Sequence, residues 1–254
     1  LASRLKKCQA VKTPQEAADL ADIVMITTFD GVIGDVADSI RWRTGQGVVH
    51  CSGVTKLDVF ESAVTQGAVA GSLHPLQAFA SVQEAVESLP GSTFGIEAEG
   101  DMRDCLEKMA LDLGGHPIFL KPSDRELYHA SVVTLGGLFM ALTGIVADIW
   151  RDNFSVSREA ALRALLPIVR GCVDTLQANG LPEGLAGPYV RGDVSTVEKH
   201  LNALKERAPK VLQSYANIAL AGLHLAQEKG RAEPDNMTTI KDMLKQYIKD
   251  NPIS

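Results

Sequence analysis

The stretch ADIVMITT at residues 21–28 contains the apolar run IVMI and predicts a β-strand that is covered on both faces. Four further short runs of this kind follow at residues 47–53, 68–74, 92–98 and 117–120. Helical patterns lie before and between them, and the first has Thr13 as its N-cap and Pro14 at its first helical position. Apolar strands that alternate with helices predict a doubly wound α/β fold with a mostly parallel sheet.

After KPSD at residues 121–124 the composition changes, and no further strand is predicted. Helical periodicity covers residues 125–153, 157–179, 193–207, 209–229 and 235–249. In the second of these segments the apolar residues form one stripe at three- and four-residue spacing: Leu162, Leu165, Leu166, Val169, Cys172, Val173 and Leu176. We therefore expect an α/β domain at residues 1–122 and an all-helical domain at residues 123–254.

The composition favours a soluble protein that handles small molecules. The 254 residues carry a formal net charge of -6 without a run of Lys and Arg interleaved with aromatic residues, which argues against a nucleic-acid surface. Four scattered cysteines without a C-x-x-C pair indicate neither a zinc knuckle nor a disulfide framework. We expect the protein to lie in a reducing cytoplasm. The sequence shows no charged segment followed by an apolar segment, which is the pattern of a signal peptide.

Residues 130–147 contain no charged side chain, and their 18 positions are the lower limit for spanning a bilayer. Ser131, Thr134 and Thr143 interrupt the run and no basic flank follows it, so we expect no membrane contact. A helix buried on most sides between two subunits explains the run better, and predicts a homodimer formed through the helical domain. The alternative is that later helices of the same chain cover it.

The first four residues indicate which dinucleotide cofactor the protein binds. In a dinucleotide-binding fold the pyrophosphate rests on a glycine-rich turn after the first strand, and the second strand ends with a residue that contacts the ribose. LASR at residues 1–4 looks like the end of a second strand, so we expect the first strand and its turn to precede Leu1. Ser3 and Arg4 would then bind a ribose 2′-phosphate and favour NADP over NAD. Alternatively, Arg4 is an ordinary surface arginine.

The stretch GSLHPLQAFA at residues 71–80 ends a predicted strand with His74, and Pro75 blocks its continuation. His74 and Gln77 can therefore face a cleft at the carboxyl edge of the sheet, where ligands of such folds bind. An imidazole there can donate a hydrogen bond to a developing alkoxide or pass a proton near neutral pH. The alternative is that His74 and Gln77 only hold the loop backbone.

Several of these segments together resemble a known family. The order of SR, ADIVMITTFDGVI, VVHCSG, GSLHPLQAFA, FGIEA, LGGHPIFL, YHASVV and GPYVRGDVSTVEKHL resembles Rossmann-like oxidoreductases with a helical C-terminal domain, once catalogued only as a domain of unknown function. These proteins are similar in layout to ketopantoate reductase, pyrroline-5-carboxylate reductase and the deazaflavin-dependent NADP reductases. The resemblance implies a Rossmann-like dinucleotide-binding domain followed by a helical substrate and dimerisation domain.

The resemblance also implies roles for further strand ends. Thr27, Thr28 and Phe29 would contact the ribose and nicotinamide side of the cofactor. Ser52 and Gly53 end the next strand, where a hydroxyl and a bare backbone suit the close approach of a ring, although Gly53 can also serve only the turn.

Two residues of the second half are weaker candidates. His129, beside Tyr128, can bind a substrate carboxylate or act as the acid, or it can be a core histidine. Arg191 can hold a carboxylate with two hydrogen bonds, or it can shape the loop before Asp193. The other histidines have no spacing that suggests a metal site.

Together these features predict an NADP-dependent oxidoreductase that reduces a small carbonyl or imine substrate, such as a 2-keto acid similar to ketopantoate, in the cleft between the domains. The catalytic candidates are His74 and His129. The alternative is a non-catalytic NADP-binding or regulatory protein that retains the fold. It is favoured by Gly136 and Gly137, which stand where the family often has an asparagine.

Overall fold

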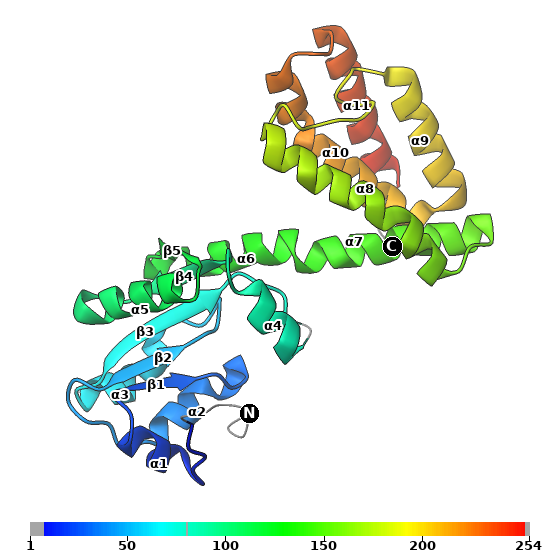
Figure 1. Ribbon diagram of the computed structural model, residues 1–254. Helices are drawn as coiled ribbons and strands as arrows, with labels where there is room; N and C mark the ends of the chain where they lie inside the picture. Colours follow the sequence, from blue (N-terminus) through cyan, green and yellow to red (C-terminus); the bar gives the residue numbers. More distant parts are fainter. Residues whose placement is uncertain (1–7, 80, 252–254) are drawn as a thin grey trace. The chain divides into compact units, whose positions relative to one another are not determined.

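A sheet of five strands in the order β1-β2-β3-β4-β5 lies at the centre of the amino-terminal half (Figure 1). The computed structural model describes residues 8–79 and 81–251. The strands are β1 (Ile23–Ile26), β2 (Gly47–His50), β3 (Val69–Pro75), β4 (Thr93–Glu97) and β5 (His116–Phe119). β1, β2 and β4 lie within the segments that the sequence predicts, whereas β3 ends one residue later and β5 begins one residue earlier than predicted. Neighbouring strands are parallel except β3 and β4, which are antiparallel, so the prediction of a mostly parallel sheet is confirmed.

The strand register brings the ends of the first three strands to one edge of the sheet. Ile26 at the end of β1 pairs with His50, and His50 pairs with Ser72 of β3. Ser72 in turn lies opposite Glu97 at the end of β4. A candidate site at the carboxyl ends of the parallel strands is therefore lined by residues that directly follow these positions.

Helices cover both faces of this sheet. Consecutive residues of a strand point to opposite faces, and Val48 and Val49 of β2 accordingly belong to two different apolar clusters. The cluster around Val48 is closed by α1 (Pro14–Asp19), α2 (Ile33–Asp38) and α3 (Glu61–Thr65). The cluster around Val49 is closed by α5 (Gly100–Asp112) on the other side (Figure 1).

Side-chain caps mark the start of two helices in this half of the chain. The hydroxyl of Thr13 accepts a hydrogen bond from the backbone N–H of Glu16, which confirms the N-cap of α1. The helix α4 (Val82–Ser88) is not among the helices that the sequence patterns predict. Ser81 caps it by accepting from the backbone N–H of Glu84, and this Ser-x-x-Glu spacing is a recognisable helix start. Short 3-10 turns occupy η2 (Asp30–Val32), η3 (Leu57–Phe60) and η4 (Pro122–Asp124).

The chain divides into two compact units, residues 1–139 and 140–254. Two helices, α6 (Arg125–Leu135) and α7 (Gly137–Phe154), occupy the segment predicted as one helix, and Gly136 separates them. The first unit extends past residue 122 because Arg125 at the start of α6 is buried against the sheet. The predicted boundary at residue 122 concerns where the substrate-binding part of the chain begins, and it stays a prediction.

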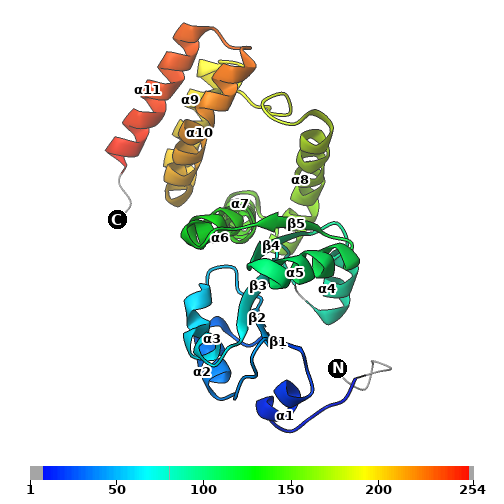
Figure 2. The same cartoon turned by 90° about the vertical axis from the view of Figure 1, so that its left-hand side faces the viewer.

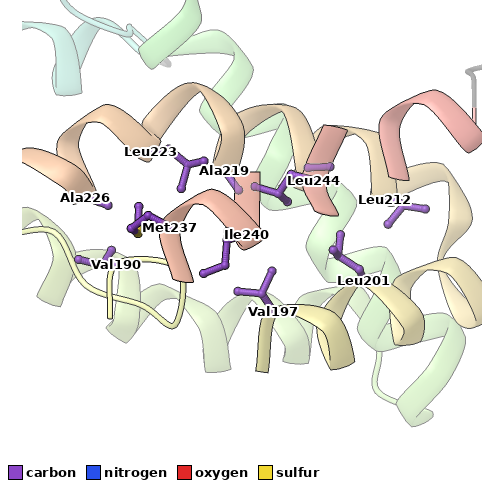
Figure 3. Close-up of a cluster of buried hydrophobic side chains, with 11 residues drawn as sticks. Val190, Val197, Leu201, Leu212, Ala219, Leu223, Ala226, Met237, Ile240 and Leu244 are labelled. Atoms are coloured by element: carbon purple, nitrogen blue, oxygen red, sulfur yellow. The ribbon is translucent and has the colours of Figure 1, made fainter. Parts of the chain in front are cut away.

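In the second unit an apolar core is shared by three helices: α9 (Val194–Arg207), α10 (Pro209–Lys229) and α11 (Pro234–Asp250). Figure 3 shows Leu201, Leu223 and Ile240, one from each helix, converging in this core. Asp193 caps α9 by accepting from the backbone N–H of Thr196, as predicted. An α/β sheet followed by a helical bundle is the fold class that the sequence predicts.

Two helices stay outside that core. In α8 (Arg158–Asn179) only Ala161 is buried, and in α7 only Ala147 is. Figure 2 shows α8 standing apart from the bundle of α9, α10 and α11. By length and composition, the helical stretch from Pro122 to Phe154 could cross a membrane, the one such stretch in the described part of the chain.

Candidate functional site

His74 and Tyr128 form the centre of the candidate site. His74 lies near the end of β3, and its Nδ1 is 2.9 Å from the hydroxyl oxygen of Tyr128 in the first turn of α6. The two rings meet edge to face, with their centroids 5.7 Å apart. Burial, with smaller contributions from His129 and Arg125, lowers the pKa of His74 to about 4, and burial raises the pKa of Tyr128 to about 12. Both side chains are therefore neutral at neutral pH.

A second imidazole lies on the other side of His74. The ring centroid of His129, one residue after Tyr128 on α6, is 5.9 Å from that of His74. Both imidazoles lie against the backbone of Gly53, which follows β2. A Cβ atom on Gly53 would be 2.8 Å from Nε2 of His74 and closer still to the ring of His129. The two histidines therefore leave no room for a side chain at position 53, whether or not a cofactor ring also approaches Gly53.

The hydroxyl of Ser52 ties together the loops that follow β1 and β2. It donates a hydrogen bond to Oδ2 of Asp30 at 2.8 Å and lies 2.8 Å from Oγ1 of Thr55. It also accepts from the backbone N–H of Thr55 at 3.1 Å. Ser52 thus fixes the shape of this edge of the sheet, and its hydroxyl is already engaged within the chain.

Arg125 links α6 to the sheet next to the candidate site. Its side chain is fully buried and forms an ion pair of 2.7 Å with Glu97. The guanidinium also donates to the hydroxyl of Ser72 at 2.8 Å and to the backbone carbonyl of Ser52 at 2.7 Å. Because Tyr128 and His129 follow three and four residues later on the same helix, Arg125 sets their position relative to His74 and Gly53.

His50 lies at the end of β2 in the same neighbourhood and is fully buried. Its ring packs against Phe60 with a centroid distance of 5.4 Å, and neither ring nitrogen has a hydrogen-bond partner within the described residues. Burial, with a smaller contribution from the Arg125 charge, lowers the pKa of His50 to about 4. This imidazole is a neutral group of the core.

The remaining predicted residues lie in different surroundings. Thr27, Thr28 and Phe29 follow β1 and are exposed, with Phe29 at 90% of its full exposure. Gln77 is exposed and donates to the carbonyl oxygen of Ser88 at 3.3 Å, so it ties down the loop after β3. Arg191 is exposed in the loop before α9 of the second unit. Ser3 and Arg4 lie outside the described residues.

No motif in the sequence marks Arg125, Glu97, Asp30 or Tyr128 as functional. A signal for the buried pair existed, because Glu97 ends an otherwise apolar strand segment, and a carboxylate in such a position requires a counter-charge. Which residue supplies that charge cannot be read from periodicity.

Comparison with solved structures gives several similar folds. The protein TM1727 from Thermotoga maritima is 20% identical, covers 83% of this chain and 81% of its own, and has a TM-score of 0.69. Pyrroline carboxylate reductase from Plasmodium falciparum, solved with NADP bound, is 15% identical over 87% of this chain and 80% of its own, with a TM-score of 0.58. An imine reductase from a Pseudomonas species is 20% identical over 92% of this chain and 83% of its own, with a TM-score of 0.53.

At these identities the similarity shows a shared Rossmann-like fold with a helical carboxyl-terminal part. Among curated proteins nothing matches the sequence significantly. One family model does match, from the residue before β4 into α10. This match, residues 92–221, covers half of the chain, and the protein therefore belongs to the family described as a domain of unknown function, DUF2520.

Proposed function

We propose that this protein is an NADP-dependent reductase of small carbonyl or imine compounds. The observation that carries the proposal is the hydrogen-bonded pair of His74 and Tyr128 at the carboxyl edge of a Rossmann-like sheet. In open α/β sheets this edge is where ligands bind. Solved proteins of similar fold include an imine reductase and a pyrroline carboxylate reductase with NADP bound, which supports the same chemical class.

The chain offers groups that suit a dinucleotide at this edge. Thr27 and Thr28 present exposed hydroxyls after β1, and the exposed ring of Phe29 offers an apolar surface beside them. These residues would contact the cofactor, and Ser3 and Arg4 are expected to contact its 2′-phosphate. When bound, NADPH supplies the hydride for the reduction of a C=O or C=N bond.

His74 is suited to polarise the substrate rather than to store a proton. With a pKa of about 4 its imidazole is neutral at neutral pH. If the hydroxyl of Tyr128 donates to Nδ1, the imidazole carries its proton on Nε2, and this N–H can donate a hydrogen bond to a carbonyl oxygen or imine nitrogen. The proton that the reduced product takes up would then come from water. Tyr128 then fixes the tautomer, and His129 adds a second imidazole within the same group of side chains.

We propose that the substrate is an imine or a 2-keto acid, and the following test distinguishes these two classes. The full-length protein is titrated with NADPH and NADH by calorimetry, and NADPH oxidation is followed with a panel of cyclic imines and 2-keto acids. Oxidation that depends on one substrate class supports the proposal and names the class. Tight binding of NADPH without oxidation of any panel member would favour a non-catalytic NADP-binding protein, and absence of binding would refute the proposal.

A further inference from the structure

Asp30 brings a carboxylate to the candidate site. It begins η2 after β1, and its Oδ2 accepts a hydrogen bond of 2.8 Å from the hydroxyl of Ser52. Gly53 follows Ser52 directly, and its backbone lies against Nε2 of His74. Burial is the main influence on the pKa of His74 and lowers it, whereas the charge of Asp30 acts in the opposite direction. The carboxylate is therefore close enough to His74 to act on a charge that is held there.

The charge of Asp30 is not balanced at this edge of the sheet. The two cations beside the site are each paired with a carboxylate: the buried Arg125 with Glu97 at 2.7 Å, and the exposed Lys56 with Glu126 at 2.5 Å. Asp30 is exposed and forms no ion pair within the described part of the chain. A ligand at the candidate site therefore meets a net negative charge.

We infer that Asp30 makes the candidate site selective for a cationic substrate, an iminium ion, over a neutral ketone or the anion of a 2-keto acid. This inference rests on the proposed function and specifies the charge of its substrate. Opposite unit charges in contact at a solvent-exposed edge attract each other enough to raise an equilibrium constant about five- to tenfold. The same carboxylate repels the carboxylate of a 2-keto acid.

The chemistry of the neighbouring side chains suits the same substrate. Hydride addition to an iminium carbon breaks a C–H bond of NADPH, forms a C–H bond on the substrate, and leaves NADP⁺ and a neutral amine. This reduction needs no proton, whereas a reduced ketone is an alkoxide that must take one up. His74 is neutral at neutral pH, because burial lowers its pKa to about 4, and Tyr128 holds its proton, because burial raises its pKa to about 12. A substrate that needs no acid therefore fits a site whose central pair is a poor acid.

The test compares two ring substrates of similar size in the full-length protein: the N-methylpyrrolinium ion, which is a permanent cation, and cyclopentanone, which is neutral. Asp30→Asn removes the charge but keeps a side-chain oxygen that can accept from Ser52. We expect kcat/KM for the cation to fall about five- to tenfold in this variant, and kcat/KM for the ketone to change less than about twofold. Asp30→Glu keeps the charge and should keep most of the preference for the cation.

The matched control is Asp38→Asn, which changes the net charge of the protein by the same amount. Asp38 is exposed and ends α2, whereas Asp30 lies in the turn before that helix. The control variant should leave kcat/KM unchanged for both substrates. Thermal unfolding checks that every variant is folded, and raising the ionic strength should reduce the effect of Asp30→Asn, because salt screens exposed charges.

A second measurement involves no turnover. Saturation-transfer NMR compares the binding of pyrrolidine, which is a cation at neutral pH, with that of tetrahydrofuran, its neutral analogue. Asp30→Asn should weaken pyrrolidine binding about five- to tenfold and leave tetrahydrofuran binding unchanged.

Equal changes in kcat/KM for the cation and the ketone in Asp30→Asn would overturn the inference, and would show that the carboxylate acts on the cofactor or on the fold. A wild type that prefers a 2-keto acid to the iminium ion would overturn it as well. If no substrate leads to oxidation of NADPH, the proposed function fails, and the NMR comparison still decides whether Asp30 selects a cation. Equal binding of pyrrolidine to the wild type and to Asp30→Asn, or no binding to either, would refute that selection.

Discussion

Nδ1 of His74 lies 2.9 Å from the hydroxyl of Tyr128, so that one hydrogen bond joins the end of β3 to the first turn of α6. The two residues are 54 positions apart in the sequence. With the pKa of His74 lowered to about 4 and that of Tyr128 raised to about 12, the pair stays neutral over the whole physiological range. The hydrogen bond with Tyr128 fixes the orientation of this neutral imidazole.

Replacing His74 by Asn should therefore lower turnover by roughly 10²–10³-fold, the range for loss of one hydrogen-bond donor to a developing oxyanion, with little change in melting temperature. Tyr128→Phe keeps the ring and removes the hydroxyl, and should lower turnover by only about tenfold. Steady-state kinetics and thermal unfolding of both variants check this. A large loss of stability in His74→Asn, with turnover per folded molecule unchanged, would identify a structural histidine instead.

Arg4→Ala in the full-length protein should weaken NADPH binding far more than NADH binding. Loss of one charged hydrogen-bonding contact to the 2′-phosphate corresponds to about 1.5–3 kcal/mol. Calorimetric titration with both nucleotides measures the difference. Equal weakening for the two nucleotides would show that Arg4 does not contact the phosphate.

Gly53→Ala should destabilise the site, because the new Cβ would lie 2.8 Å from Nε2 of His74 and still closer to the ring of His129. Overpacking of this kind costs about 1–3 kcal/mol in the free energy of unfolding, which urea denaturation measures. Gly31→Ala is the matched control, since a Cβ at Gly31 meets no atom within 4 Å. If the two variants unfold at the same urea concentration, the histidines do not require the glycine.

Arg125→Met should reduce the free energy of unfolding by about 3–5 kcal/mol, because it leaves Glu97 buried without a counter-charge. Adding Glu97→Gln to this variant should recover part of the loss, and urea denaturation of the single and double variants measures the recovery. Lys108→Ala removes the exposed pair with Asp112 and should leave the midpoint nearly unchanged. A double variant less stable than Arg125→Met would contradict this account of the buried pair.

The buried histidine His50 predicts a pH dependence of stability. Its pKa is about 4 in the folded protein and about 6.5 when unfolded, so between these values the unfolded chain binds the extra proton. The contribution of His50 to the free energy of unfolding should therefore fall by about 1.4 kcal/mol per pH unit as the pH drops from 6.5 towards 4, and should be constant above 6.5.

His50→Gln removes this titration, and urea denaturation at several pH values should show a flatter profile for the variant in the same window. His74, whose pKa is also about 4, keeps its own contribution in the variant. An unchanged slope would mean that His50 is protonated in the folded protein.

The sequence by itself determined the features that depend on neighbouring residues. Apolar runs gave the five strands, Thr13 and Asp193 were recognised as helix caps, and His74 was placed at a strand end. These features are local, because periodicity and capping act within a few residues. The missed helix α4 belongs to this class, since Ser81 and Glu84 already mark its start.

Only the tertiary structure decided which distant residues meet. Arg125 finds Glu97 across 28 positions and Ser72 across 53, and the antiparallel pairing of β3 with β4 brings those two partners opposite each other. The structure also shows that Gln77 donates to the carbonyl oxygen of Ser88, and that α7 and α8 each bury only one residue. Contacts of this kind depend on how the sheet and the helices pack, because packing brings together residues that are distant in the sequence. Local sequence patterns carry no information about which distant residues become neighbours in space.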